Sequence, residues 1–364
     1  MRVELLEAGS REAWDRFVAS SSRFGLLQSW AWGEFQERRG LEVARVAVTR
    51  EGAIVAGAQV LLGPTSTGRA GLAYISNGPL VDRRDDDLTR ALFAAVHEVA
   101  HHHKASATLI EAPLTDTAEA HGWLGALGFG PARPDDAQRF TVAVDLARDR
   151  GSIERSMHRS VRRAIRRAER SDLRVVEGDE ADLPTLYVLL KRSAERSRST
   201  IRPFEYYRDQ WEVLGRSADL SFLVALRDGR AVAARIAAAF GSGATLLQLA
   251  SRAEARSRGA GALLARDQLL WAHDRGCERY DMRRVRDRAD EILRWGDPAP
   301  HAPRGQLRRA RRLLRRSGAR QVQYVAAHTF AYTSSMRRLL ECVDPVPGTA
   351  DRLASLSDRL DPRI

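Results

Sequence analysis

Arginine is concentrated in two short segments of this 364-residue chain, and both have the spacing of amphipathic helices. Apolar residues recur with a 3.6-residue period on one face of each segment, and the arginines take the opposite face. The apolar residues are Met157, Val161, Ala164, Ile165 and Ala168 in segment 156–170, and Leu307, Ala310 and Leu314 in segment 304–321. From Pro298 to Leu340 there are ten arginines and no acidic residue, so this stretch supplies most of the net charge of +12.

Clustered arginines are typical of polyanion binding, because each guanidinium that neutralises a phosphate releases condensed counterions. Nucleic acid is therefore the leading partner that these segments predict. The alternative is a solvated charged face in an arginine-rich chain, since only two of the 59 basic residues, Lys104 and Lys191, are lysines. Clustering favours the polyanion, because acidic residues balance arginine almost everywhere else.

A second anion-binding pattern is the run Arg-Ser-Arg-Gly-Ala-Gly at residues 256–261, which follows a predicted strand and opens a predicted helix. Glycines let the backbone approach a ligand there, and free N–H groups at a helix start can receive a pyrophosphate. The pattern R-x-x-G-x-G is typical of acetyl-CoA-dependent N-acetyltransferases, so coenzyme A is an alternative donor. His97 and His101 share a helix face, but no further ligands follow at zinc-like spacing, which favours surface histidines over a metal site.

The composition, with 44% hydrophobic and 29% charged residues, is that of a soluble protein long enough for two domains. Cys277 and Cys342 are too few for a disulfide framework, which favours a reducing cytoplasm. The N-terminal residues have no apolar signal core, and no run approaches the ~20 apolar residues that span a bilayer. We therefore expect a cytoplasmic protein, whose contact with the inner membrane surface would be peripheral and made by its basic face.

Hydrophobic periodicity predicts the same order of elements in each half of the chain: hairpin, strand, helix, strand. In the first half these are residues 42–63, 72–82, 87–103 and 107–114, and in the second half 222–241, 244–251, 259–276 and 279–285. Further strands are predicted at 138–146, closing the first half, and at 321–330. Two copies of one mixed α/β unit are the economical interpretation, with a cleft between them as the default site.

Five stretches resemble, in order, the landmarks of the FemABX peptidyltransferases. They are LLQSWAWGEFQERRG (26–40), YISNGPLVD (74–82), LIEAPL (109–114), VRRAIRRAERSDLRV (161–175) and GALLARDQLLWAHDRGCERYD (261–281). The resemblance covers roughly residues 24 to 340. It implies an α/β (α+β) fold of two tandem GNAT-like (acyl-CoA N-acyltransferase-like) domains, with residues 1–145 completed by about 325–364 as the first and residues 146–324 as the second. It also implies transfer of an amino acid from aminoacyl-tRNA to an amine of a peptidoglycan precursor, with no cofactor.

The resemblance also implies several of the site residues, whereas Tyr206 is expected as an aromatic ring that could stack on a base, and the arginines of segment 304–321 are expected from their clustering. Trp32 belongs to the opening motif with Gln28, Trp30 and Gly33, and Gly78 to the glycine-proline turn. Glu111 stands at the family's acidic position before a proline, and Tyr280 and Asp281 form its tyrosine-aspartate pair. The expected substrate-binding residues are Trp32, Gln36, Gly78, Tyr206 and Tyr280, and the expected tRNA-binding residues are Arg162, Arg166, Arg308, Arg309, Arg311 and Arg312.

The chain departs from the family pattern at several positions. Gln36 replaces a lysine that meets acceptor phosphate, and Leu314-Arg315 replaces a phenylalanine-lysine pair. Arg283 and Arg284 replace glycines. These changes leave a small-molecule acceptor open as an alternative to peptidoglycan, and a non-catalytic RNA-binding relative as a third interpretation.

Transfer from an ester to an amine needs positioning, donors for the oxyanion, and a path for the amine proton. Arg315 could stabilise the oxyanion but could never act as a base. Glu111 or Asp281 could hold the acceptor ammonium or take its proton. The structural alternatives are that Asp281 pins a strand end against Arg283 or Arg284, and that Glu111 pairs with an arginine.

Overall fold

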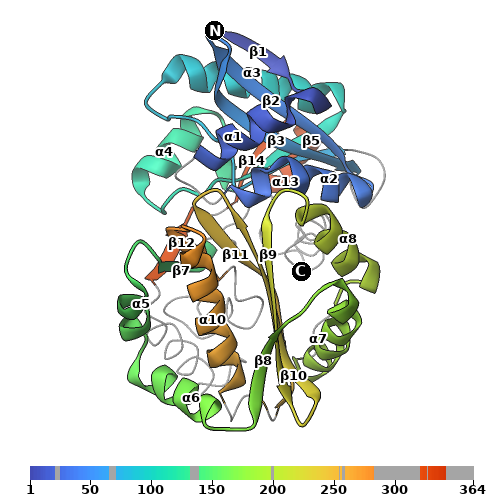
Figure 1. Ribbon diagram of the computed structural model, residues 1–364. Helices are drawn as coiled ribbons and strands as arrows, with labels where there is room; N and C mark the ends of the chain where they lie inside the picture. Colours follow the sequence, from blue (N-terminus) through green and yellow to red (C-terminus); the bar gives the residue numbers. More distant parts are fainter. Residues whose placement is uncertain are drawn as a thin grey trace. The chain divides into compact units, whose positions relative to one another are not determined.

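The computed structural model (Figure 1) describes residues 1–20, 25–64, 71–131, 139–197, 201–253, 255, 259–282, 320–325 and 327–341. The chain divides into two compact units. The first comprises Met1–Arg139 with Gln323–Ile364, and the second comprises Phe140–Val322.

The described strands of the first unit form a seven-stranded mixed sheet in the order β1-β2-β3-β4-β5-β14-β6. The strands are β1 (Arg2–Leu5), β2 (Glu42–Arg50), β3 (Ala53–Pro64), β4 (Gly71–Ser76), β5 (Ala105–Glu111), β6 (Gly130–Pro131) and β14 (His328–Ala331). The helices are α1 (Arg11–Ser20), α2 (Trp30–Arg38), α3 (Asp86–His102), α4 (Ala118–Ala126) and α13 (Ser334–Glu341). The β2–β3 hairpin turns at Glu51 and Gly52, both with positive φ, as its Glu-Gly pair predicts.

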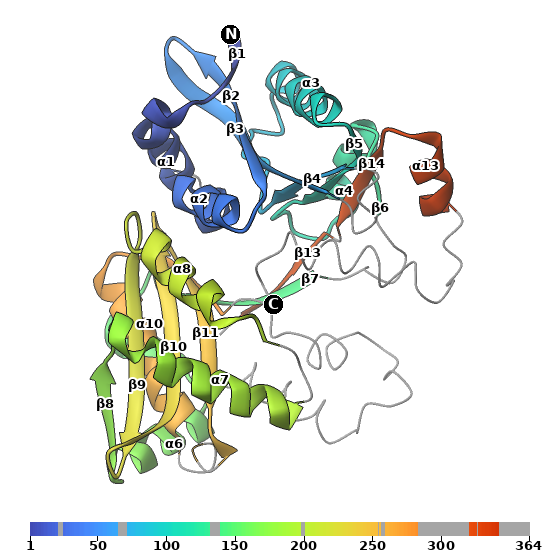
Figure 2. The ribbon, with the colours of Figure 1, turned by 90° about the vertical axis from the view of Figure 1, so that its right-hand side faces the viewer.

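Helices cover both faces of this sheet, with α3 on one face and α1 and α2 on the other (Figure 2). Side chains alternate along each strand, so Ala56, Ala58 and Val60 of β3 enter the core beneath α3. The residues between them face α1 and α2. That second face carries buried polar side chains, among them Gln59 of β3 and Arg45 of β2.

The second unit also has a seven-stranded sheet among its described residues, in the order β13-β7-β12-β11-β10-β9-β8. The strands are β7 (Arg139–Asp145), β8 (Leu173–Glu177), β9 (Asp219–Arg227), β10 (Arg230–Phe240), β11 (Gly243–Ser251), β12 (Arg279–Asp281) and β13 (Arg320–Tyr324). The helices are α5 (Arg150–Ser156), α6 (Arg159–Glu169), α7 (Leu183–Ser197), α8 (Phe204–Leu214) and α10 (Ala260–Asp274). Helices α5, α6 and α10 lie on one face, and α7 and α8 on the other (Figure 1).

The two sheets repeat one topology. In each, an antiparallel meander leads into a parallel pair, β4–β5 in the first unit and β11–β12 in the second. Parallel neighbours need a crossover connection, and α3 and α10 supply it. The repeat predicted from the sequence is therefore present in the arrangement of the strands.

Two predicted strands lie elsewhere than the sequence pattern indicated. The strand predicted to close the first half, β7, belongs to the second sheet, where Val144 pairs with Tyr280 of β12. The single strand predicted at 321–330 is two strands, of which β13 joins the second sheet and β14 joins the first. Both differences arise because long-range pairing, which local periodicity does not encode, decides sheet membership.

The predicted helix at 304–321 falls outside the described residues except for its last two, which begin β13. Among the helices described, none is both long enough and apolar enough to cross a membrane.

Candidate functional site

Glu111 is the last residue of β5 and is 3% exposed. Its carboxylate accepts a hydrogen bond from the hydroxyl of Tyr74, which lies on the neighbouring strand β4. Its main-chain oxygen accepts from the N–H of Asn77 at 3.0 Å, just before the cis Gly78–Pro79 bond. A carboxylate is costly to bury without such partners. Glu111 is therefore held in a defined position at the carboxyl end of a parallel strand pair.

The amide of Gln28 fixes the turn that follows β4. It accepts from the N–H of Gln59 at 2.7 Å and donates to the main-chain oxygen of Ser76 at 2.7 Å. A Cβ on Gly78 would lie 2.9 Å from this amide. Gly78 is thus a glycine because the Gln28 side chain packs against its Cα, which places it in the framework around Glu111.

Helix α2 is locked to the sheet by Arg45, a residue that sequence reasoning missed. The Arg45 guanidinium lies 3.8 Å from the Trp30 ring centroid and donates to the Trp30 main-chain oxygen at 3.1 Å. Burial lowers the pKa of Arg45 to about 10. A Cβ on Gly33 would lie 2.1 Å from the Arg45 Nη2 atom, so a larger residue there would force the guanidinium to shift. The only sequence signal was an arginine at an inward position of an apolar strand.

Trp32 and Gln36 are fully buried on α2. The Gln36 side-chain oxygen accepts from Arg39 at 3.1 Å, while its buried Nε2 finds no hydrogen-bond partner within the described part of the chain. Neither side chain is exposed in this structure. Their roles in substrate binding stay predictions.

Tyr280 of the second unit is fully buried and belongs to a polar network under α10. Its hydroxyl donates to Gln268 of α10 at 2.6 Å, and Arg235 of β10 donates to the same Gln268 oxygen at 3.0 Å. Burial raises the pKa of the Tyr280 hydroxyl. Arg235 and Gln268 were missed because each looks like a surface residue in its local sequence.

Asp281 points to the opposite face of the sheet from Tyr280, because successive strand residues alternate. It is 9% exposed, on the face that α7 and α8 cover. Tyr206 of α8 is also buried on that face, where its hydroxyl contacts Gln210 at 3.5 Å, and Gln210 accepts from Gln248 of β11 at 3.0 Å. The structure thus separates Tyr280 from Asp281 and places Tyr206 on the side of Asp281.

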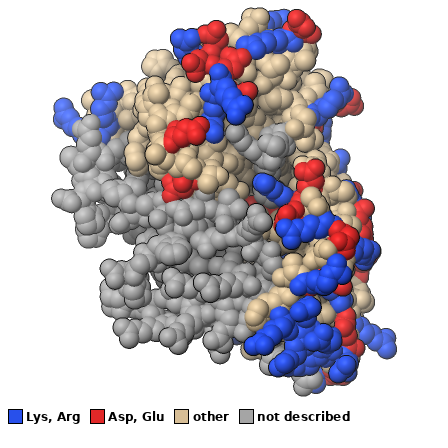
Figure 3. Space-filling view, turned by 90° about the vertical axis from the view of Figure 1, so that its left-hand side faces the viewer, with Lys and Arg blue, Asp and Glu red and all other residues tan. Residues whose placement is uncertain are grey.

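Helix α6 presents a continuous basic face. Its buried residues Ile165 and Ala168 face the core, whereas six arginines of this segment are exposed: Arg159, Arg162, Arg163, Arg166, Arg167 and Arg170. The one acidic residue of α6, Glu169, is paired with Arg266 of α10. Figure 3 shows a cluster of Lys and Arg side chains at the bottom of the view, where α6 lies. The predicted tRNA-binding residues Arg162 and Arg166 are therefore both available to a polyanion.

The other predicted basic residues lie outside the described residues: Arg308, Arg309, Arg311, Arg312 and the predicted catalytic residue Arg315.

The start of α10 offers a structural explanation for one glycine of the coenzyme A pattern. Gly259 has a φ of 83°, and a Cβ there would lie 2.3 Å from the main-chain oxygen of Ala164 in α6. Glycine is thus required for the packing of α6 against α10. Gly261 has no such neighbour, since a Cβ there would meet nothing within 4 Å, and Arg256 to Arg258 lie outside the described residues.

His97, expected at the surface, is half-buried. Its Nδ1 lies 2.6 Å from the hydroxyl of Tyr332, and its ring packs at 4.4 Å from that of Phe330. Burial lowers the pKa of His97. Within the described ranges no cluster of three or more metal-ligating side chains is found.

Comparison with known proteins finds a match in each unit. A FemAB family model matches residues 10–121, and an acetyltransferase (GNAT) domain model matches residues 155–291. A lipid II:glycine glycyltransferase of Staphylococcus aureus (strain MRSA252) is 27% identical over 222 residues, which cover 58% of this chain and 53% of the relative. The chain thus spans about half the length of the curated relatives it matches.

Two solved structures share the fold. The crystal structure of FemX superposes with a TM-score of 0.80 at 19% identity, covering 94% of this chain and 100% of that one. A tandem GNAT protein from the clavulanic acid biosynthesis pathway gives a TM-score of 0.52 at 16% identity, covering 90% and 98%. The predicted tandem GNAT-like fold is confirmed. The chain is thus similar to the FemAB family over residues 10–121 and to acetyltransferase (GNAT) domains over residues 155–291.

Proposed function

We propose that this protein is an aminoacyltransferase that moves an amino acid from aminoacyl-tRNA to an amine of a peptidoglycan precursor. The observation that carries the proposal is Glu111, a buried carboxylate held by Tyr74 inside the region that the FemAB model matches. The name of the relatives, lipid II:glycine glycyltransferase, supports both the reaction class and a peptidoglycan acceptor.

The reaction forms one bond and breaks one. The acceptor amine attacks the carbonyl carbon of the aminoacyl ester, the C–N bond forms, and the bond from that carbon to the ribose oxygen breaks. The amine proton must reach the departing ribose oxygen. Glu111 takes this proton from the attacking amine and returns it to the departing ribose oxygen, and the Tyr74 hydroxyl holds the carboxylate in one orientation. We assign Arg315 the role of stabilising the developing oxyanion, as its position in the family pattern implies.

The donor is held through its phosphates. Arg162, Arg163 and Arg166 are exposed on α6 and form a positive face, and Glu169 of the same helix is paired with Arg266. Such a face binds an RNA backbone without reading its sequence, which suits an enzyme that recognises the charged end of a tRNA. The phosphate contacts position the donor, and the chemistry is left to the carboxylate and the oxyanion donor.

Coenzyme A is the second candidate donor, favoured by the GNAT domain match over residues 155–291. That match includes the glycines at the start of α10. Against coenzyme A, the packing of α6 already explains Gly259. With either donor, a small-molecule amine is the alternative acceptor.

The role of Glu111 is tested by replacing it with glutamine. We expect Glu111→Gln to lower the single-turnover rate of transfer by about 10²–10⁴-fold, the usual contribution of a general base. The matched control is Glu119→Gln, an exposed carboxylate on α4 in the same unit. Both variants should keep the wild-type circular dichroism spectrum. Wild-type turnover by Glu111→Gln would remove this residue from the chemistry.

A further inference from the structure

Strand β1 is an open edge of the first sheet and carries an unusual share of exposed apolar side chains. Among the described strands its one neighbour is β2. Six large apolar residues are exposed among those described, and three of them are Met1, Val3 and Leu5, with 64%, 41% and 60% exposure. An open apolar edge is a template for pairing with another strand.

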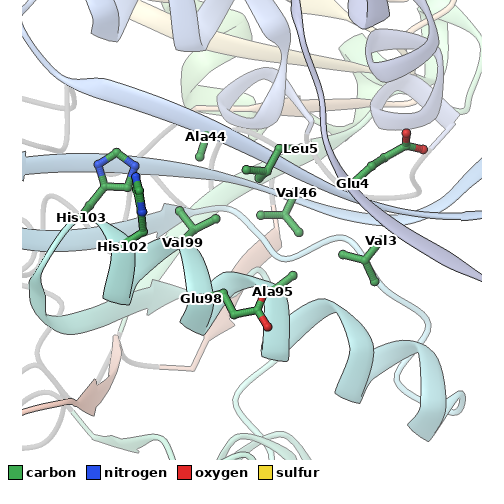
Figure 4. Close-up of a pocket in the computed structure, with 10 residues that line it drawn as sticks. All are labelled: Val3, Glu4, Leu5, Ala44, Val46, Ala95, Glu98, Val99, His102 and His103. Carbon is green, nitrogen blue, oxygen red and sulfur yellow. The ribbon is translucent and has the colours of Figure 1, made fainter.

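The apolar side chains of β1 continue into a groove. Val3 and Leu5 lie on the α3 face of the sheet, because they pair with Val48 and Val46 of β2. With Ala95 and Val99 of α3 they line a groove of about 320 Å³, shown in Figure 4. The groove adjoins the strand edge, and Glu4, Glu98, His102 and His103 also line it.

The hydrogen-bond pattern shows which peptide groups of β1 face outward. The N–H of Leu6 donates to the main-chain oxygen of Arg45, so these two residues form a hydrogen-bonded pair. Such pairs alternate along an antiparallel ladder, so Arg2 and Glu4 also direct their main-chain groups toward β2. The N–H and C=O groups of Val3 and Leu5 therefore point to the open edge.

We propose that β1 pairs with β1 of a second copy of this chain, antiparallel and about a two-fold axis at Val3. In this register the outward N–H and C=O of Val3 bond to those of Val3 in the second copy. Arg2 then lies opposite Glu4 of the second copy in a non-hydrogen-bonded pair, where side chains come closest. The two-fold axis generates this ion pair twice, as an isologous interface requires.

Charge selects this register over its neighbour. The outward peptide groups of the two copies also meet when the two-fold axis passes through Glu4. In that register Val3 of one copy lies opposite Leu5 of the other. That arrangement places Glu4 opposite Glu4, and like charges in this position are destabilising. The Arg2-Val3-Glu4 sequence is thus self-complementary in one register, with apolar side chains on the α3 face and paired charges on the other.

Charge reversal tests the interface. Sedimentation equilibrium of the full chain, with any affinity tag at the C-terminus, should show a dimer for the wild type. Arg2→Glu and Glu4→Arg each place like charges together twice, and each should raise the dimer dissociation constant by about tenfold or more. The double variant Arg2→Glu/Glu4→Arg should restore the wild-type dissociation constant. A wild type that stays monomeric at every concentration, or single variants that dimerise normally, would overturn the proposal.

A cross-link fixes the register independently. Val3→Cys should form a disulfide-linked dimer under mild oxidation, because Cα atoms about 5.5 Å apart in a hydrogen-bonded pair fall within the range of a disulfide. The control is Ala126→Cys, an exposed position at the end of α4. Equal cross-linking of both variants would contradict a two-fold axis at Val3.

Discussion

The basic face of α6 gives a quantitative prediction for RNA binding. Arg162, Arg163 and Arg166 are exposed on α6, and within the part of the chain that the structure describes no ion pair involves them. Replacing all three by glutamine removes three positive charges and keeps long side chains with good helix propensity. The helix should persist, because Ile165 and Ala168 still hold it to the core.

The size of the effect follows from counterion release. If each of the three arginines neutralises one phosphate, the slope of log affinity against log salt concentration should fall in magnitude by about 2 to 3. Affinity near 0.15 M salt should drop by about tenfold to a hundredfold, with the difference from wild type narrowing as salt rises. The assay is a salt titration of tRNA binding by fluorescence anisotropy.

A matched control separates the α6 face from net charge. Arg50, Arg90 and Arg216 are exposed arginines that pair with Asp85, Asp87 and Glu212. Replacing these three by glutamine changes the net charge equally, yet should leave the salt slope nearly unchanged. If the slope of log affinity against log salt concentration decreases equally in both triple variants, binding reflects overall charge, and the assignment of α6 to the RNA site is refuted.

Three further predictions concern the framework. Because burial lowers the pKa of His97, the folded state disfavours its protonated form. The contribution of His97 to the free energy of unfolding should therefore be complete above about pH 6.5 and decrease as the pH falls below that value. In urea titrations at several pH values, the free energy of unfolding of His97→Phe should decrease less at low pH than that of the wild type, and an equal decrease would contradict this prediction. Gly33→Ala should destabilise by about 1–3 kcal/mol in the same titration, because its Cβ meets Arg45, whereas Gly122→Ala on α4 meets nothing and should be neutral or stabilising. Gly259→Ala should destabilise the protein, because its Cβ would meet Ala164. Gly261→Ala should leave both stability and tRNA-dependent transfer intact, and loss of that transfer would show that this position matters for the reaction.

Features encoded locally could be predicted from the sequence. The hairpin turns at Glu51-Gly52 and Asp228-Gly229 adopt the left-handed conformations that such pairs favour. The crossover helices α3 and α10 follow from their apolar periodicity, and the repeated order of elements gives the tandem fold. In each case a short window of residues carries the whole signal.

Features set by distant residues could not be predicted. His97 is buried by Phe330 and Tyr332, which come from β14 and its end, and the His97–Tyr332 contact joins residues 235 positions apart. Arg45 lies at an inward position of its strand, but nothing local shows that the Trp30 ring and the Cα of Gly33 enclose it. Tyr74 gains its role only because β4 pairs in parallel with β5 and places it beside Glu111. Contacts between residues distant in the sequence therefore matter more for predicting the candidate site than for predicting the fold.

The most direct test of the proposed function follows an amino acid from ester to amide. Purified protein is given tRNA charged with a pool of labelled amino acids, together with a lipid-linked peptidoglycan precursor, and in parallel labelled acetyl-CoA with the same precursor. The label is base-labile in the tRNA ester and base-stable in an amide. We predict base-stable label in the precursor from charged tRNA, and none from acetyl-CoA. Label transferred from acetyl-CoA but from no charged tRNA would contradict the account.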